Sequence, residues 1–131
     1  MPVLIGLNAA ATSTHLLAGQ MIPKPILLTG EIDTGANHCS VAPSILQRLG
    51  VTSHASGSSL TATGPATVSL YRISLSIVGR TGAANPMLTF PDLEVTNLLV
   101  PLSVDVLIGL DAMLICQLLV NGPARQFTLT F

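Results

Sequence analysis

The apolar run Ile26–Ile32 leads directly into the turn sequence Asp-Thr-Gly-Ala at residues 33–36. The run begins after a proline and ends at a turn, which is typical of a β-strand. About seventy residues further on, Val106–Gly109 offers a second apolar strand that ends in glycine. A glycine there allows another backbone to come close. The two segments together predict a loop carrying Asp33 that a glycine-containing strand supports from behind.

Other apolar runs separated by turn residues recur along the chain and predict a mainly-β, barrel-like domain over residues 1–131. The long segment Asn8–Pro25, rich in Ala, Thr and Gly, is expected to be mobile or partly a strand. A hairpin is expected to turn near residues 63–65, and a further turn is expected at 121–123. The remaining expected elements are strands over Val3–Leu7, Ile26–Ile32, Val68–Val78, Met87–Val100 (one or two) and Gln126–Phe131, and short helices over Pro43–Gly50 and Asp111–Cys116.

The composition is apolar for a chain of 131 residues, which is long enough for one domain with a core. Hydrophobic residues make up 49% of the chain and charged residues only 8%. So much apolar surface on one small domain favours burial against a partner subunit. The Lys and Arg residues number 5 and are scattered, so no nucleic-acid partner is expected.

No membrane segment, export signal or bound metal is expected either. The apolar runs are too short and too interrupted to span a bilayer, and the first twenty residues contain no Lys or Arg. Cys39 and Cys116 could form a disulfide or remain as buried thiols. We favour thiols, and with them a reducing, cytoplasmic location. The three histidines have no metal-ligand spacing with the cysteines, so neither a metal nor another cofactor is expected.

The order of these motifs resembles the retropepsin-like aspartic proteases, most closely their bacterial members. The resemblance covers nearly the whole chain and implies a mainly-β, closed or partly open barrel of the acid-protease type, with one or two short helices. One Asp-Thr-Gly motif supplies half of an active site, so dimerisation would complete it. The matching segments are Glu31–Ala36, Val41–Gly50, Thr61–Ile77, Asp105–Asp111 and Asn121–Phe131.

The resemblance implies an aspartic endopeptidase in which Asp33 from each of two chains meets its counterpart at the two-fold axis. Thr34 would hydrogen-bond across that axis, and Gly35 would leave its N–H free for the carboxylate. Asp33, Thr34 and Gly35 are therefore the candidate catalytic residues, and peptides or proteins are the expected substrates.

The resemblance also implies a substrate cleft and a hairpin flap that closes over it. Ile108 and Gly109 would pack behind the active-site loop, where a side chain at Gly109 would collide. The candidate substrate-binding residues lie on the loop, its strands and the flap tip: Glu31, Ala36, Asn37, Ala62, Thr63, Gly64, Pro65 and Ile108.

The sequence departs from the family pattern at two places. Many relatives have an Arg after the glycine of the second motif, paired with an acidic residue just beyond the first. Leu110 and Asn37 occupy those places here. Glu31 stands where relatives have an aliphatic residue. It is either a solvated edge carboxylate or, because alternate strand residues share a face, a group beside Asp33 that tunes specificity or pH dependence.

Two other functions stay open at this point. The first is a catalytically inert dimeric domain that binds peptides or partner chains in the same groove. The second is a small ligand-binding β-barrel that does not depend on dimerisation. The intact Asp-Thr-Gly sequence favours the peptidase.

Overall fold

The computed structural model describes residues 1–61, 63–80, 85–99 and 103–131. Most of the described elements are strands, with three short helices among them. In chain order they are β1 (Pro2–Gly6), α1 (Ala9–Leu17), β2 (Ile26–Ile32), β3 (Ser40–Val41), α2 (Pro43–Leu49), β4 (Ala55–Thr61), β5 (Gly64–Val78), β6 (Met87–Asn97), β7 (Val106–Ile108), α3 (Leu110–Met113), β8 (Gln117–Asn121) and β9 (Gln126–Thr130).

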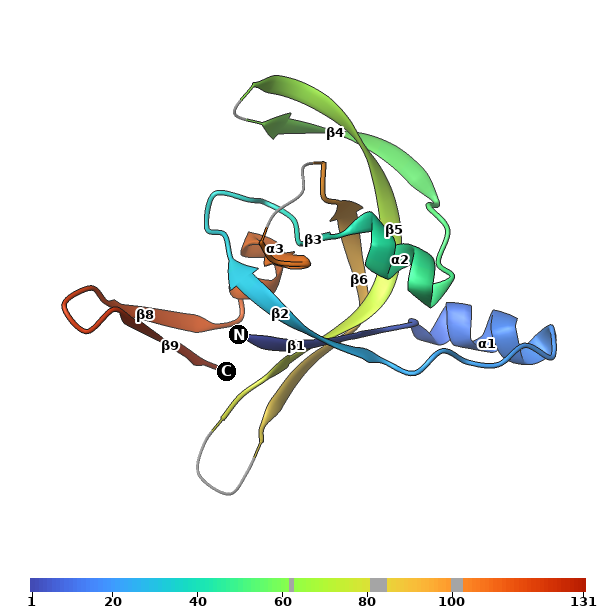
Figure 1. The fold of residues 1–131 in the computed structure, drawn as a ribbon, viewed down its shortest axis with the longest axis horizontal. Coiled ribbons are helices and arrows are strands. Elements are labelled where there is room, and N and C mark those ends of the chain that lie inside the picture. The colour runs from blue at the N-terminus through green and yellow to red at the C-terminus, as the bar shows by residue number, and fades with distance from the viewer. Residues whose placement is uncertain (62, 81–84, 100–102) are drawn as a thin grey trace.

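Six strands close into a mixed barrel in the order β1-β2-β7-β3-β6-β5, because β1 pairs with both β2 and β5. β2 and β7 run parallel, with Ile32 opposite Ile108. β3 fits between β7 and β6, antiparallel to the first and parallel to the second. The mainly-β, barrel-like fold predicted from the sequence is confirmed, and it is consistent with the acid-protease fold (Figure 1).

The barrel interior is filled by aliphatic side chains from alternate strand positions. In β5, for example, Ile73, Leu75 and Ile77 are buried while the residues between them are not. α2 packs Ile45, Leu46 and Leu49 onto this core. It begins at Pro43 and is capped at its end by Gly50, whose φ of 69° is a left-handed conformation that glycine adopts readily.

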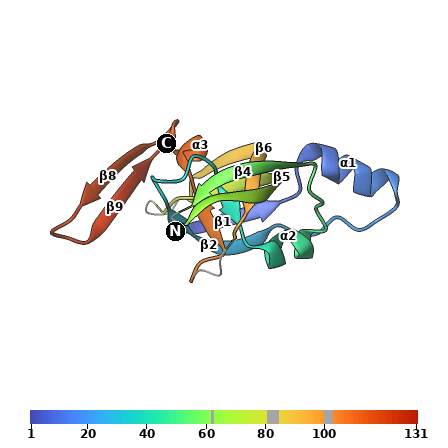
Figure 2. The same cartoon turned by 90° about the horizontal axis from the view of Figure 1, so that it is seen from above.

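Two hairpins extend away from the barrel. β4 and the first half of β5 form one, which curves over the end of the barrel where the loop after β2 lies (Figure 1). β8 and β9 form the other, a two-stranded sheet separate from the barrel sheet. Figure 2 shows this second hairpin at one end of the molecule and α1 at the opposite end.

The expectation for the segment Asn8–Pro25, which follows β1, was wrong. Residues 9–17 form helix α1, where a mobile stretch or a strand was predicted. The side chain of Asn8 caps this helix by accepting a hydrogen bond from the Ala11 amide at 2.8 Å. α1 buries none of its residues, so no apolar periodicity marked it in the sequence.

The other predicted elements lie close to their expected positions, whereas the strands β3 and β8 were not predicted. The helix expected over Asp111–Cys116 begins one residue earlier and is shorter, since α3 covers Leu110–Met113 with Gly109 as N-cap. One strand, β6, occupies the described part of Met87–Val100, and Val100 lies outside the described residues. Both cysteines are free, and Cys39 is buried. No helix among the described residues is long and apolar enough to cross a membrane.

Candidate active site

The loop that follows β2 presents Asp33 at the end of the barrel. The Asp33 amide donates to the carbonyl of Ile108 at 3.0 Å, which continues the β2–β7 pairing by one residue. The Gly35 amide donates to Asp33 Oδ1 at 2.9 Å. A Cβ at Gly35 would lie 3.2 Å from that same oxygen, a tight contact. The contact that the sequence predicts between Gly35 and the carboxylate is therefore present, and it orients Asp33.

Gly109 lets β7 pack directly behind this loop. A Cβ at this position would lie 2.5 Å from the carbonyl carbon of His38 and 2.6 Å from its oxygen. Both atoms belong to the backbone, so they could not move aside as a flexible side chain could. The predicted collision at Gly109 is thus confirmed, and any larger residue would push the loop away.

Ile108 does not contribute to a substrate surface. Its side chain is fully buried in the barrel core. The assignment of Ile108 to substrate binding is wrong, because its side chain points inward, and its backbone supports the loop through the hydrogen bond to Asp33. Ala36 and Asn37, by contrast, lie on the loop itself. Ala36 is half-buried and Asn37 is exposed.

The carboxylate of Asp111 ties the far end of the loop to α3. It accepts hydrogen bonds from the Cys39 amide at 3.0 and 3.1 Å and from the Cys39 thiol at 3.0 Å. The sequence predicts Asp111 at the start of a short helix and at the end of the family-like segment Asp105–Asp111, but not as a partner of Cys39. The two residues lie 72 positions apart, so no local pattern in the sequence could have shown the contact.

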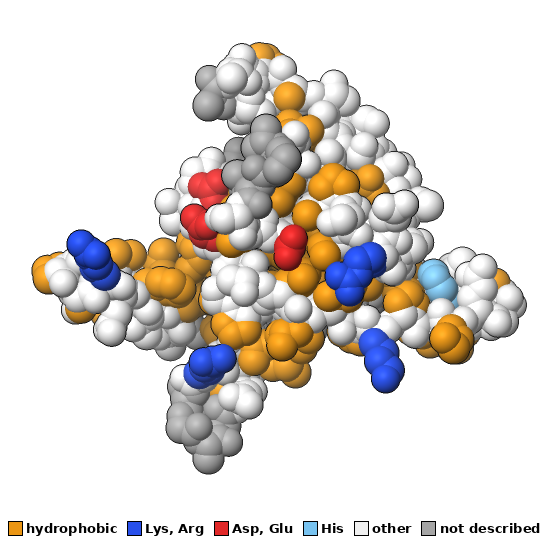
Figure 3. Space-filling view, viewed as in Figure 1, with side chains coloured by type: hydrophobic (Ala, Val, Ile, Leu, Met, Phe, Trp, Pro, Cys, Tyr) orange, Lys and Arg blue, Asp and Glu red, His pale blue; other side chains and the backbone are white. Residues whose placement is uncertain are grey.

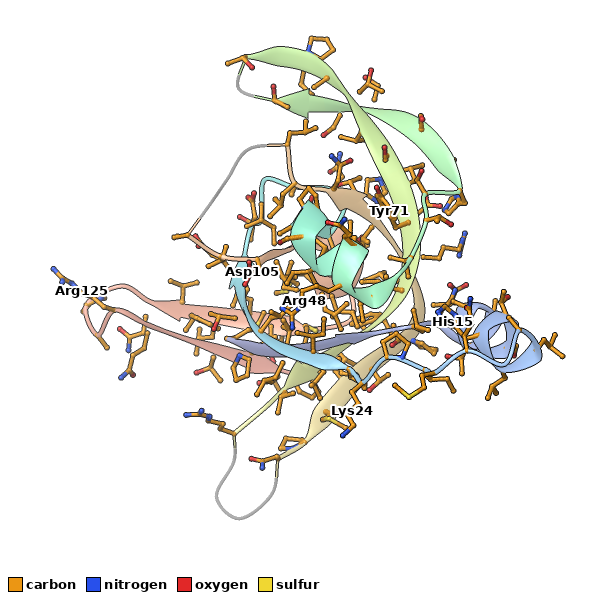
Figure 4. All side chains as sticks on the ribbon, turned by 45° about the vertical axis from the view of Figure 1, so that its right-hand side comes forward. His15, Lys24, Arg48, Tyr71, Asp105 and Arg125 are labelled. Atoms are coloured by element: carbon orange, nitrogen blue, oxygen red, sulfur yellow. The ribbon has the colours of Figure 1, made fainter. Side chains whose placement is uncertain are left out.

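Glu31 lies on the outward side of β2 with Leu27 and Thr29, all three exposed. It lines a hollow of about 620 Å³ between β2 and the β8–β9 hairpin. Thr34 of the active-site loop and Arg125 of the hairpin line the same hollow. Figure 4 shows Arg125 at the tip of the hairpin. The structure therefore brings Glu31 and Thr34 together beside the hairpin.

The predicted flap corresponds to the β4–β5 hairpin. The Thr61 hydroxyl donates to the Gly64 carbonyl at 2.7 Å and closes the turn. Gly64, with a φ of 118°, supplies a backbone conformation that other residues rarely adopt. Thr63 and Pro65 are exposed, and Pro65 already pairs with Leu60 in the hairpin. Ala62, also predicted to lie at the tip, falls outside the described residues.

The described residues contain no group of three or more His, Cys, Asp or Glu side chains arranged to hold a metal ion. The polar groups on the loop include the Asp33 carboxylate, the Thr34 hydroxyl and the backbone amides. A carboxylate with a hydroxyl neighbour can activate water as a general base.

Comparison with known proteins gives one family. A family model described as aspartyl protease matches residues 25–112, which is more than half of the chain. The matched region runs from the start of β2 to α3 and includes the Asp33 loop, the β4–β5 hairpin and Gly109. No curated protein matches the chain.

Proposed function

The chain belongs to the aspartyl protease family, and from this premise we propose that it is an aspartic endopeptidase that acts as a homodimer. Asp33 of each copy supplies one carboxylate of the catalytic pair. The observation that carries this proposal is the orientation of Asp33, whose Oδ1 is held by the Gly35 amide on a loop backed by β7. That loop lies within the matched family region.

The chemistry follows from bringing two carboxylates together. Two such groups a few ångströms apart cannot both ionise, so they share one proton, as in aspartic proteases generally. The ionised Asp33 removes a proton from a bound water, which attacks the scissile carbonyl carbon. The protonated Asp33 of the other copy polarises the carbonyl oxygen. Thr34, exposed beside the carboxylate, hydrogen-bonds across the two-fold axis and holds the two loops together.

The β8–β9 hairpin supplies the main dimer contact in this proposal. Its strands pair with each other and form no part of the barrel sheet. Leu119, Val120 and Phe127 on the hairpin are each at least half exposed. Figure 3 shows apolar side chains along much of its length. A second copy that pairs with β9 and covers this surface would remove both the free strand edge and the apolar exposure.

Substrate binding falls to the groups around Asp33. An extended peptide lies between the active-site loop, with Ala36 and Asn37, and the flap residues Thr63, Gly64 and Pro65. Glu31, which shares the hollow beside the hairpin with Thr34, favours polar or basic substrate side chains at one subsite in this proposal.

Replacing Asp33 tests the proposal. Asp33→Asn removes the base and the shared proton, so peptide cleavage should fall by about a thousandfold or more. Asp105→Asn is the matched control, because Asp105 is an exposed carboxylate at the start of β7 and takes no part in the chemistry. Cleavage of a peptide library by purified wild type and both variants measures the effect. Undiminished cleavage by Asp33→Asn would refute the assignment.

A further inference from the structure

The carboxylate of Asp111, which lies outside the proposed catalytic pair, accepts several hydrogen bonds. The donors are the Cys39 amide, the Cys39 thiol and the Ala112 amide, the last at 2.8 Å. The Asp111 amide donates to the Asn37 carbonyl at 3.1 Å. The side chain of Asp111 is only 18% exposed. These bonds join α3 to the loop that begins with Asp33.

Cys39 is the other half of this connection and is fully buried. Burial, and then the hydrogen bond to Asp111, raise the pKa of the Cys39 thiol well above its usual range. The thiol therefore stays protonated at neutral pH and can donate to the carboxylate. Its sulfur also accepts a hydrogen bond from the Gly109 amide at 3.3 Å. The thiol thus links β7, α3 and the loop.

The loop has few other side-chain anchors at this end. Leu110 and Asn37 stand where many relatives have an Arg and its acidic partner, but they carry no charges and cannot form an ion pair. The Leu110 amide donates to the Ala36 carbonyl at 2.8 Å, a backbone contact. His38 Nδ1 lies 3.7 Å from Asp111 Oδ2, but His38 is mostly exposed, so this pair is weak.

We propose that Asp111 and Cys39 are positioning residues for the reaction. Their thiol–carboxylate pair fixes the far end of loop 33–39 on α3 and so sets where the Asp33 carboxylate lies at the two-fold axis. This inference rests on the proposed function, because it concerns the same site. Neither residue touches the substrate or the reacting atoms.

The effect should appear in turnover more than in substrate binding. A displacement of about 1 Å in a catalytic group can lower the rate by about a hundredfold. Among the described residues that the proposal places against the peptide, Asp111 binds only Asn37, through its own amide and the Asn37 carbonyl. Weakening the pair should therefore lower kcat and leave KM nearly unchanged.

Four variants test this. Asp111→Asn replaces one acceptor oxygen with an NH₂ group that faces the Cys39 donors. Cys39→Ala removes the thiol donor, while Cys39→Ser restores a donor at the same position. Cys116→Ala is the matched control, because Cys116 is the other cysteine and, among the described residues, its thiol hydrogen-bonds only to the Ala112 carbonyl, at 3.6 Å. We expect kcat to fall by about tenfold in Asp111→Asn and Cys39→Ala, and to recover in Cys39→Ser.

Amide hydrogen exchange over residues 34–39 gives a second readout that does not depend on cleavage. Exchange should speed up in Asp111→Asn and Cys39→Ala, and should match wild type in Cys39→Ser and Cys116→Ala. If the wild type cleaves no peptide, the proposed function fails while exchange still tests the pair. Unchanged exchange, or faster exchange with unchanged kcat, would overturn the positioning role. If Asp111→Asn does not fold, the proposal is tested by Cys39→Ala and Cys39→Ser alone. Equal kcat and equal exchange in these two variants would then overturn it.

Discussion

There is no room for a side chain at Gly109, because the backbone of the active-site loop packs directly against it. The carbonyl group of His38 and the amide of Cys39 occupy the space where a Cβ would be. Their closeness allows the Gly109 amide to reach the Cys39 sulfur and lets β7 support the Asp33 loop. The position of Asp33 therefore depends on a residue that lies outside the loop.

A methyl group at Gly109 should disturb that position. Gly109→Ala should lower the free energy of unfolding by about 1–3 kcal/mol, because the backbone of residues 38–39 must move. It should also lower kcat, since the loop moves with it. Gly122→Ala is the control for stability, because no described atom lies within 4 Å of a Cβ built there. Urea unfolding compares the stability of the two variants, and peptide cleavage compares kcat of Gly109→Ala with that of the wild type. Equal unfolding free energies for the two variants would show that the loop does not rest on Gly109.

Among the helices and strands, the sequence predicts those in which buried side chains leave a regular spacing of apolar residues. β2 was predicted with its observed bounds, and α2 to within one residue, because the burial of Ile45, Leu46 and Leu49 leaves a helical spacing. The predicted Gln126–Phe131 strand appears as β9. Its partner β8 was not predicted, although the apolar residues before the Asn-Gly turn could have indicated a hairpin.

The sequence could not predict elements and contacts that depend on distant parts of the chain. α1 buries no residue, so only its cap at Asn8 marks it. The Asp111–Cys39 pair joins residues that only the closed barrel brings together. Ile108 was assigned wrongly because, in the sequence alone, an apolar residue beside a site can belong either to the core or to the wall of the substrate cleft. The strand register decides between the two, and it buries Ile108.

Asn8 gives a prediction for α1. It accepts from the Ala11 amide and donates to Asp92 Oδ1 at 2.9 Å, and this hydrogen bond, followed by the charge of Arg72, lowers the pKa of Asp92. Asn8→Ala should cost about 1–2 kcal/mol of unfolding free energy at neutral pH. A carboxyl group whose pKa is lowered by folding stabilises the protein at pH values above its ordinary pKa. This stabilisation is lost as the pH falls through the lowered pKa.

The difference between wild type and Asn8→Ala should therefore narrow on acidification, without closing, because the cap itself does not titrate. Urea unfolding at neutral pH and at about pH 3 measures the difference. Thr14→Ala is the control in the same helix, since its hydroxyl donates to the Ala10 carbonyl of that helix and, in the described part of the chain, to no other element. A difference independent of pH would show that Asn8 stabilises the helix without acting on Asp92.

At the scale of the whole molecule, the chain combines few charges with much exposed apolar surface. Leu114 and Ile115 lie 81% and 61% exposed just before the β8–β9 hairpin, which adds its own apolar side chains. The hairpin and the Asp33 loop also share the hollow lined by Glu31 and Thr34. A second copy docked on the hairpin would thus cover the apolar surface next to the loop that needs a partner.

In the proposed dimer, one active site is built from two chains. Calorimetric titration with a statine-type peptide, which mimics the tetrahedral transition state, counts these sites. Such a compound binds an assembled pair of Asp33 residues, so we predict one inhibitor bound for every two chains and no tight binding to Asp33→Asn. Tight binding of one inhibitor to each chain, or equal binding to Asp33→Asn, would contradict the claim.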